Sequence, residues 1–142
     1  MRITTKGRYA LRAILYLVHC SDRKPVSIKT LAEKTQLPME FLEQIFFRLR
    51  KAGIIQSMRG PGGGFTFIKD PKTISVHDIF IAVDEGYHVA PCTSDDKERA
   101  NCELSADCVA CDFWNHTNSI FIEYFSRVSI QDVLDHKFPD LL

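Results

Sequence analysis

Two short amphipathic segments joined by a tight turn, with a glycine-rich segment directly after them, constrain the fold of this chain more than any other feature. Ser27 is placed to cap a helix that ends near Thr35. Pro38 suits the first position of the next helix, because its missing N–H would have no intrahelical partner there, and Gly53 suits the residue that ends it. With a further amphipathic helix expected over residues 5–19, this spacing predicts a helix-turn-helix.

The second helix of this pair leaves polar and basic side chains outside its buried stripe. The stripe is predicted from Phe41, Leu42, Ile45, Phe46, Leu49 and Ala52. The outer face keeps Glu40, Glu43, Gln44, Phe47, Arg48, Arg50 and Lys51. Such a face is typical of a helix that enters the major groove of DNA.

A β-hairpin is expected directly after these helices. Runs of β-branched and aromatic residues at 54–57 and 65–68 flank a tip, residues 58–64, that is rich in glycine. A phosphate-binding loop is excluded, because no Lys-Ser/Thr follows the glycines and the G-x-G-x-x-G spacing is not met. The hairpin predicts the wing of a winged helix, and the expected fold class is mostly α with a small β-hairpin.

The net charge of zero conceals a strong division of charge along the chain. Residues 1–73 carry 14 Lys and Arg against 5 Asp and Glu, a difference of +9, whereas residues 74–142 carry 4 against 13, a difference of −9. A basic half of this kind favours a polyanionic partner, and nucleic acid is the leading one. A solvated basic face without a partner remains the alternative.

Length and composition indicate an ordinary globular protein with one core. The chain has 142 residues, of which 45% are hydrophobic and 25% charged. Its longest apolar stretch, residues 13–18, is far shorter than the roughly 20 residues of a membrane span, and its start lacks the cleavage region of a secretory signal. We therefore expect a cytoplasmic protein with no membrane partner, whose five cysteines are reduced, metal-bound or redox-active.

The acidic half contains a long polar segment with four cysteines. After a helix capped by Ser75, residues 87–111 show no hydrophobic period and hold Cys92, Cys102, Cys108 and Cys111. Four thiolates suit an iron–sulfur cluster or tetrahedral zinc. Only Cys108 and Cys111 have the spacing that zinc knuckles prefer, which weakens zinc without excluding it. Redox-active thiols without a metal stay open as well.

The segment over residues 112–128 is predicted to be a helix with apolar side chains over more than half of its circumference. One edge can pack on the chain's own core and the other on a partner subunit, as in a dimerisation helix. A fully internal helix is the alternative, which a core of this size can barely enclose. A short terminal helix is expected over residues 129–134. The dimer interface is predicted from Phe113, Trp114, Ile120, Phe121, Tyr124 and Phe125.

A family resemblance rests on three parts of the sequence and spans nearly the whole chain. They are KGRYALRAILYLV, LEQIFFRLRKAGIIQSMRGPGGGFTF and the cysteine segment that Asp112-Phe113-Trp114 follows. The chain resembles the Rrf2 family of bacterial winged-helix transcription regulators, and in particular its IscR- and NsrR-like members, which carry iron–sulfur clusters. The resemblance implies a homodimer that binds partly palindromic double-stranded DNA, with the third helix in the major groove and the wing at the adjacent minor groove.

In the matching segments, Glu43 falls where the family has a base-reading residue, and Arg59 where a wing arginine enters the minor groove. Both roles are chemically sound, because a carboxylate can accept a hydrogen bond from cytosine N4 and a narrow minor groove attracts arginine. A solvated glutamate and a mobile hairpin-tip charge are the respective alternatives. Further DNA contacts are expected from Ser27, Lys29, Gln44, Arg48, Arg50 and Gly60.

The same resemblance implies a cluster held by three loop cysteines, which Cys92, Cys102 and Cys108 match, while Cys111 occupies the place of a variable fourth ligand. The cluster type, 2Fe–2S or 4Fe–4S, stays open, because the first two cysteines are further apart than in IscR-like members. His88 is the candidate to replace Cys111, and Cys20 is interpreted as a buried apolar residue. Nearby carboxylates disfavour free thiolates unless a metal compensates for the charge; they are Asp95, Asp96, Glu98, Glu103, Asp107 and Asp112.

The sequence thus predicts a DNA-binding region, residues 1–73, and a second region, residues 74–142, with a linker helix, a cysteine loop (87–111) and a dimerisation helix (112–128). The expected function is sequence-specific transcription regulation, as a repressor, controlled by an iron–sulfur cluster that senses redox state, iron–sulfur status or nitric oxide. The alternative is a cluster-free or zinc-binding regulator that uses cysteine oxidation. A thiol–disulfide enzyme is disfavoured, because no nucleophile, base and orienting group form a set.

Overall fold

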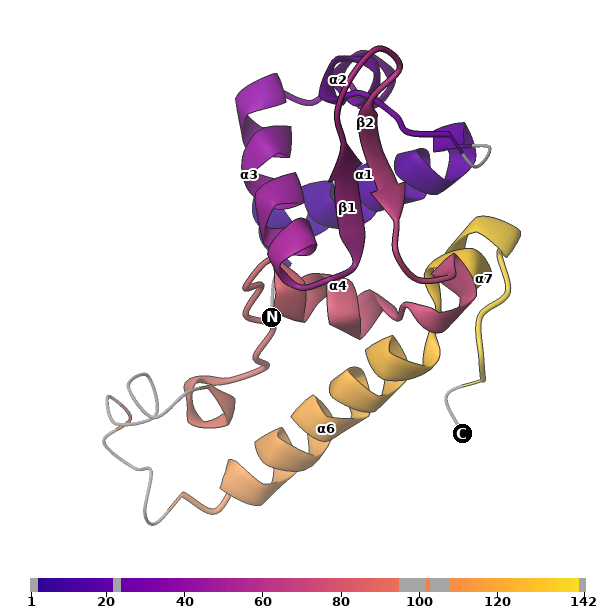
Figure 1. The fold of residues 1–142 in the computed structure, drawn as a ribbon. Helices are drawn as coiled ribbons and strands as arrows, with labels where there is room; N and C mark the ends of the chain where they lie inside the picture. Colours follow the sequence, from indigo (N-terminus) through magenta and orange to yellow (C-terminus); the bar gives the residue numbers. More distant parts are fainter. Residues whose placement is uncertain (1–2, 22–23, 95–101, 103–107, 141–142) are drawn as a thin grey trace.

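In the described part of the chain, six α-helices, two short 3₁₀-helices and a two-stranded hairpin form a head from which one long helix extends (Figure 1). The computed structural model describes residues 3–21, 24–94, 102 and 108–140. Asp95, Asp96, Glu98, Glu103 and Asp107, the carboxylates expected around the cysteines, lie outside the described residues. In chain order the elements are α1 (Thr5–Ser21), α2 (Ile28–Thr35), α3 (Met39–Lys51), β1 (Ile55–Met58), β2 (Gly64–Phe67), η1 (Pro71–Thr73), α4 (Val76–Ala82), η2 (Pro91–Thr93), α6 (Cys111–Arg127) and α7 (Ile130–Asp135).

The helix-turn-helix, α2 and α3, forms where it was predicted, because local preferences fix its ends. The Oγ of Ser27 accepts the backbone N–H of Thr30 at 3.1 Å and caps α2. Gly53 follows α3 with a φ of +71°, a conformation that glycine adopts without strain. The prediction that Pro38 is the first helical residue was wrong by one position, since its ψ of 134° is extended and Met39 begins the helix.

One hydrophobic core connects the basic and the acidic halves of the chain. The predicted stripe of α3 is buried except at its ends: Phe41 is half-buried against Tyr9, at 5.4 Å between ring centroids, and Ala52 is exposed. Ala52 was expected inside, but it is the C-terminal cap of α3 and lies beyond the last buried turn. Further core side chains come from α1 (Ala10, Ala13, Ile14, Leu17), from α4 (Ile79, Phe80) and from the first residue of α7, Ile130.

The predicted wing is an antiparallel hairpin of β1 and β2, in which Ile55 pairs with Phe67 and Met58 with Gly64. An additional bridge joins Phe65 to Val26, the residue before the cap of α2. At Gly64 a side chain is excluded, because a Cβ atom would lie 2.3 Å from the carbonyl oxygen of Val26. The hairpin is therefore fixed against the residues that lead into α2 at the end of β2 nearest its turn.

Helices α4 and α7 begin side by side, through capping boxes in which Ser75 and Ser129 are the cap residues. The two serines form an isolated antiparallel bridge. Next to it, the N–H of Val76 donates to the carbonyl of Val128 at 2.9 Å. Helix α6 therefore ends where α4 begins.

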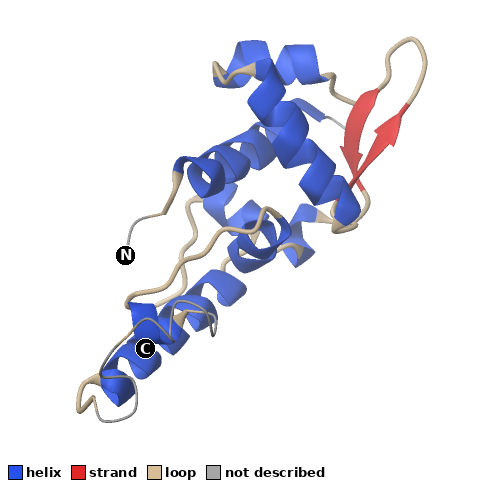
Figure 2. Cartoon of the chain, turned by 90° about the vertical axis from the view of Figure 1, so that its left-hand side faces the viewer, coloured by secondary structure: helices blue, strands red, loops and turns tan. Residues whose placement is uncertain are grey.

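Helix α6 runs away from the head that α1–α4 and the hairpin form, and it extends in the direction opposite to the hairpin (Figures 1 and 2). It begins at Cys111, one residue before the predicted start, because the N–H of Cys111 already joins a turn by donating to the carbonyl of Cys108 at 3.1 Å. Its first part contacts η2 and its last part contacts α4. None of the helices in the described ranges combines the length and the apolar character that a bilayer crossing requires.

Candidate DNA-binding face and cysteine site

The predicted DNA-contacting residues lie on α2, α3 and the hairpin tip, which share the upper end of the molecule in Figure 1. Lys29 is exposed on α2, and Ser27 at its start is partly buried because its hydroxyl is engaged as the cap. Arg59 and Gly60 are exposed at the hairpin tip, where Gly60 has a φ of +100°. The fold therefore brings residues that are more than 30 positions apart in the sequence to one end of the molecule.

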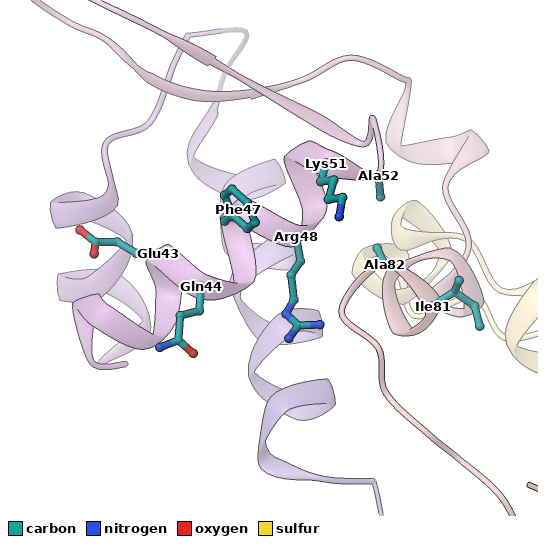
Figure 3. Close-up of a pocket in the computed structure, with 8 residues that line it drawn as sticks. All are labelled: Glu43, Gln44, Phe47, Arg48, Lys51, Ala52, Ile81 and Ala82. Carbon is teal, nitrogen blue, oxygen red and sulfur yellow. The ribbon is translucent and has the colours of Figure 1, made fainter. Parts of the chain in front are cut away.

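The outer face of α3 forms one wall of a cleft of about 770 Å³ (Figure 3). The opposite wall is the end of α4, with Ile81 and Ala82. Four polar or charged residues of α3 and one aromatic ring line the cleft: Glu43, Gln44, Arg48 and Lys51, with Phe47. Arg50 lies beside this row, 3.5 Å from the hydroxyl of Ser57 on β1.

An acidic pair at the end of α4, Asp84 and Glu85, connects α4 to α3 and α1. The Asp84 carboxylate lies 3.8 Å from the Arg48 guanidinium, and its backbone carbonyl accepts a hydrogen bond from the Lys6 ammonium group. Glu85 is only 3% exposed, and its Oε1 accepts the N–H of Thr4 at 2.7 Å. The pair therefore links α3 and α1 to the segment that leads into the cysteines.

Sequence reasoning missed this acidic pair. The available signal is the start of α1, which has no acidic residue in its first turn and so lacks the usual local partner for its free N–H groups. Glu85 fills that role from a position 78 residues away, accepting the N–H of Gly7 at 3.0 Å.

The cysteines lie at the far end of the molecule from the hairpin, around η2 and the first turn of α6. Cys92 is 8% exposed within η2, and Cys102, Cys108 and Cys111 are partly buried. Burial raises the pKa of the Cys92 thiol, and the neighbouring thiols of Cys111 and Cys102 raise it further. Two of the other predicted ligands, Cys111 and Cys102, therefore lie near enough to Cys92 to affect its pKa.

Cysteine thiolates fit a soft metal centre in their chemistry. In the part of the chain that the structure describes, no three His, Cys, Asp or Glu side chains already stand in a metal-binding arrangement. His88, the alternative ligand, is partly buried four residues before Cys92 and does not form such a group among the described residues. Cys20 lies at the end of α1, outside this group of thiols.

The residues predicted for a dimer interface fall on two faces of α6. Phe125 packs on its own chain, with its ring centroid 5.4 Å from Phe80 and 5.2 Å from Tyr87, and Tyr124 packs on the same core. Phe121 is half-buried. The other face is solvent-exposed in the single chain, where Phe113 is 61%, Ile120 44% and Trp114 38% exposed.

Comparisons with known proteins agree with this architecture. A family model described as "Rrf2: Iron-dependent Transcriptional regulator" matches residues 3–136. The HTH-type transcriptional regulator IscR of Photorhabdus laumondii is 33% identical over 137 residues, which are 96% of this chain and 81% of that protein. The solved structure of T. potens IscR has a TM-score of 0.74 at 27% identity and covers 96% of this chain and 88% of its own.

A second solved structure is CymR, the global cysteine regulator of B. subtilis, with a TM-score of 0.73 at 28% identity, covering 96% of this chain and 98% of its own. These relatives are transcriptional regulators and not enzymes. The winged-helix fold and the family resemblance predicted from the sequence are both confirmed. The chain belongs to the Rrf2 family of DNA-binding transcription regulators.

Proposed function

We propose that the protein is a homodimeric repressor whose affinity for a partly palindromic operator is controlled by an iron–sulfur cluster. Cys92, Cys102, Cys108 and Cys111 would hold the cluster, as 2Fe–2S or 4Fe–4S. The observation that carries the proposal is the position of Cys92 in η2 and of Cys108 and Cys111 just before and at the start of α6, two elements that contact each other. Soft thiolates in this number match the ligands of iron–sulfur centres.

The opposite end of the molecule supplies the DNA contacts in this proposal. Glu43 accepts a hydrogen bond from a cytosine in the major groove, while Gln44 contacts a neighbouring base or phosphate. Lys29, Arg48 and Arg50 neutralise phosphates. The hydroxyl of Ser27 and the backbone of Gly60 fix the register on the duplex. Arg59 enters the adjacent minor groove from the hairpin tip. The exposure of these charged side chains supports the assignment.

The chain's own contribution to signalling is to orient α6. Cys111 is the first residue of α6, so holding its side chain fixes the first turn of that helix, while Val128 is held at the other end by its hydrogen bond to Val76. The exposed face between these points, with Trp114 and Ile120, would meet a second copy of the chain. The direction of α6 then sets the separation of the two α3 helices, about 34 Å for half-sites one DNA turn apart. When bound, the cluster supplies redox chemistry and reactivity towards oxidants or nitric oxide.

A second candidate is regulation by cysteine oxidation without a metal. The thiol of Cys111 is near enough to that of Cys92 to raise its pKa, so these two cysteines are the candidates for a disulfide under oxidising conditions. The structural relative CymR is described as a global cysteine regulator, a title that names no metal.

The decisive experiment is anaerobic purification of the full chain with measurement of iron, zinc and acid-labile sulfide. We expect brown protein, and we expect Cys92→Ala, Cys102→Ala and Cys108→Ala each to abolish stable cluster assembly. Cys111→Ala should leave a more labile cluster. Cys20→Ala is the matched control, because it removes a thiol at the end of α1 and should leave the iron and sulfide content unchanged.

The cluster-loaded and cluster-free proteins are then compared on an operator selected from random duplex DNA, by fluorescence anisotropy at two salt concentrations. Binding should weaken steeply with salt, because phosphate contacts release counterions. Full cluster occupancy in all four ligand variants would refute the ligand set, and equal affinity in both states would refute the sensor. Colourless protein with stoichiometric zinc would support a zinc-binding regulator in place of the cluster. A Cys92–Cys111 disulfide that by itself changes operator affinity would support regulation by cysteine oxidation.

A further inference from the structure

An exposed aromatic ring stands in the middle of the recognition face of α3. Phe47 is 58% exposed, although the preceding residue, Phe46, is fully buried in the core. In Figure 3 its ring stands out from α3 between Glu43, one turn earlier, and Lys51, one turn later. Apart from Met39 at the start of α3, the other exposed side chains of the helix are polar or charged. Phe47 belongs neither to the core nor to the partly buried apolar side chains that pack against it.

The Phe47 ring has a cationic neighbour that is itself anchored. The Arg50 guanidinium lies 5.8 Å from the ring centroid, within the range of a cation–π interaction. Arg50 also reaches Ser57 on β1, at 3.5 Å, so the guanidinium is placed between α3 and the hairpin. The ring is therefore kept on the outer face, next to a charge suited to a phosphate.

We infer that Phe47 reads thymine, by placing its ring against the 5-methyl group in the major groove. The inference rests on the proposed binding of α3 in that groove. Thymine is the base that presents a methyl group there, and apolar side chains recognise it by contact. The basic charge of residues 1–73 supports duplex DNA as the occupant of this face.

The position of Phe47 relative to Glu43 also predicts where the thymine lies. One helical turn separates them, about 6 Å along the helix axis. Base pairs are stacked about 3.4 Å apart, so the thymine that Phe47 contacts should lie within about two base pairs of the cytosine that Glu43 contacts. Each half-site of the operator should therefore contain a cytosine and a thymine in close succession.

The test removes the methyl group from the DNA and the ring from the protein, separately and together. An operator selected by the full chain is resynthesised with deoxyuridine in place of each thymine in turn, which deletes one methyl group and retains base pairing. Wild-type affinity should fall about fourfold at one thymine of each half-site, the equivalent of about 0.8 kcal/mol for one methyl group taken out of water. Phe47→Ala should bind the thymine and deoxyuridine operators equally well, and Phe47→Leu should retain part of the difference.

Ile81→Ala is the matched control. Ile81 lines the same cleft and is 62% exposed, but it lies on α4, and its replacement should leave the deoxyuridine effect unchanged. Sequence-specific binding with the same deoxyuridine effect in wild type and Phe47→Ala, or with no such effect in wild type, overturns the inference and leaves the proposed function intact. Absence of any sequence-specific binding refutes the proposed function itself. Loss of the deoxyuridine effect in Ile81→Ala as well would show that the effect does not come from contact with the Phe47 ring, and would also overturn the inference.

Discussion

Replacing Gly7 by alanine should destabilise this protein, although alanine is the better helix former. Gly7 is the third residue of α1, and an added Cβ atom would lie 2.8 Å from Cδ and Cγ of Glu85. Contacts this short do not occur between well-packed atoms, so the Glu85 side chain would have to move. It is 3% exposed and accepts hydrogen bonds from Thr4 and Gly7, which it would lose on moving.

The magnitude follows from two opposing contributions. Hydrogen bonds to a charged group contribute about 1.5–3 kcal/mol to stability, and the Glu85 carboxylate is also the N-terminal acceptor of α1. Alanine in place of glycine in a helix raises the free energy of unfolding by about 1 kcal/mol. We therefore expect Gly7→Ala to lower the free energy of unfolding by about 1–2 kcal/mol. In a Glu85→Ala background, where no carboxylate is displaced, the same change should raise it by about 0.5–1 kcal/mol.

Urea unfolding of the four proteins, wild type, both single variants and the double variant, measures this sign reversal. The proteins should be compared free of metal and at one protein concentration, because ligands and association shift apparent stability. With a slope of about 2 kcal/mol per molar urea, Gly7→Ala should lower the midpoint by about 0.5–1 M. Effects of Gly7→Ala that agree in the two backgrounds within about 0.5 kcal/mol would refute the coupling between Gly7 and Glu85.

Three further predictions concern association and DNA binding. Trp114→Glu, which adds a charge to the exposed face of α6, should give a folded monomer by light scattering; an unchanged dimer would exclude this face. Asp84→Asn releases Arg48 from its ion pair, so operator affinity at low salt should rise about two- to threefold in anisotropy titrations. The increase is small because an exposed ion pair contributes at most about 1 kcal/mol. Glu43→Ala should relax base preference and Arg59→Ala should weaken binding at narrow minor grooves by about 1–3 kcal/mol; unchanged selectivity in both contradicts the assignments.

The parts of the fold that sequence predicted well are those that local chemistry determines. Ser27, Ser75 and Ser129 each cap a helix through a residue three positions later, and each helix begins directly after its serine. The hairpin was predicted one residue early on its first strand, because the apolar run begins at Ile54 while the ladder begins at Ile55. The bridge between Phe65 and Val26 joins residues 39 positions apart, so no local pattern encodes it.

The candidate site was predictable in its residue types and not in its connections. Four cysteines in one segment indicate a soft metal site from composition alone, and the broad apolar stripe of α6 indicates a partner. Which edge of that stripe is internal depends on Phe80 and Tyr87, which meet Phe125 only in the folded chain. The contact of Glu85 with Gly7 spans 78 positions, so it too lies beyond any helical or strand period.

The contact between Tyr87 and Phe125 has a consequence for how this architecture can change. The chain leaves the core at Tyr87 and returns to it at Phe125, and the two rings are 5.2 Å apart. The entropy of closing such an excursion depends only on the logarithm of its length, so doubling the length costs about 0.6 kcal/mol. Changes in length between Tyr87 and Phe125 that leave the packing of α6 in place should therefore cost the remaining chain little stability. A single DNA-reading scaffold can in this way be coupled to inputs of quite different chemistry.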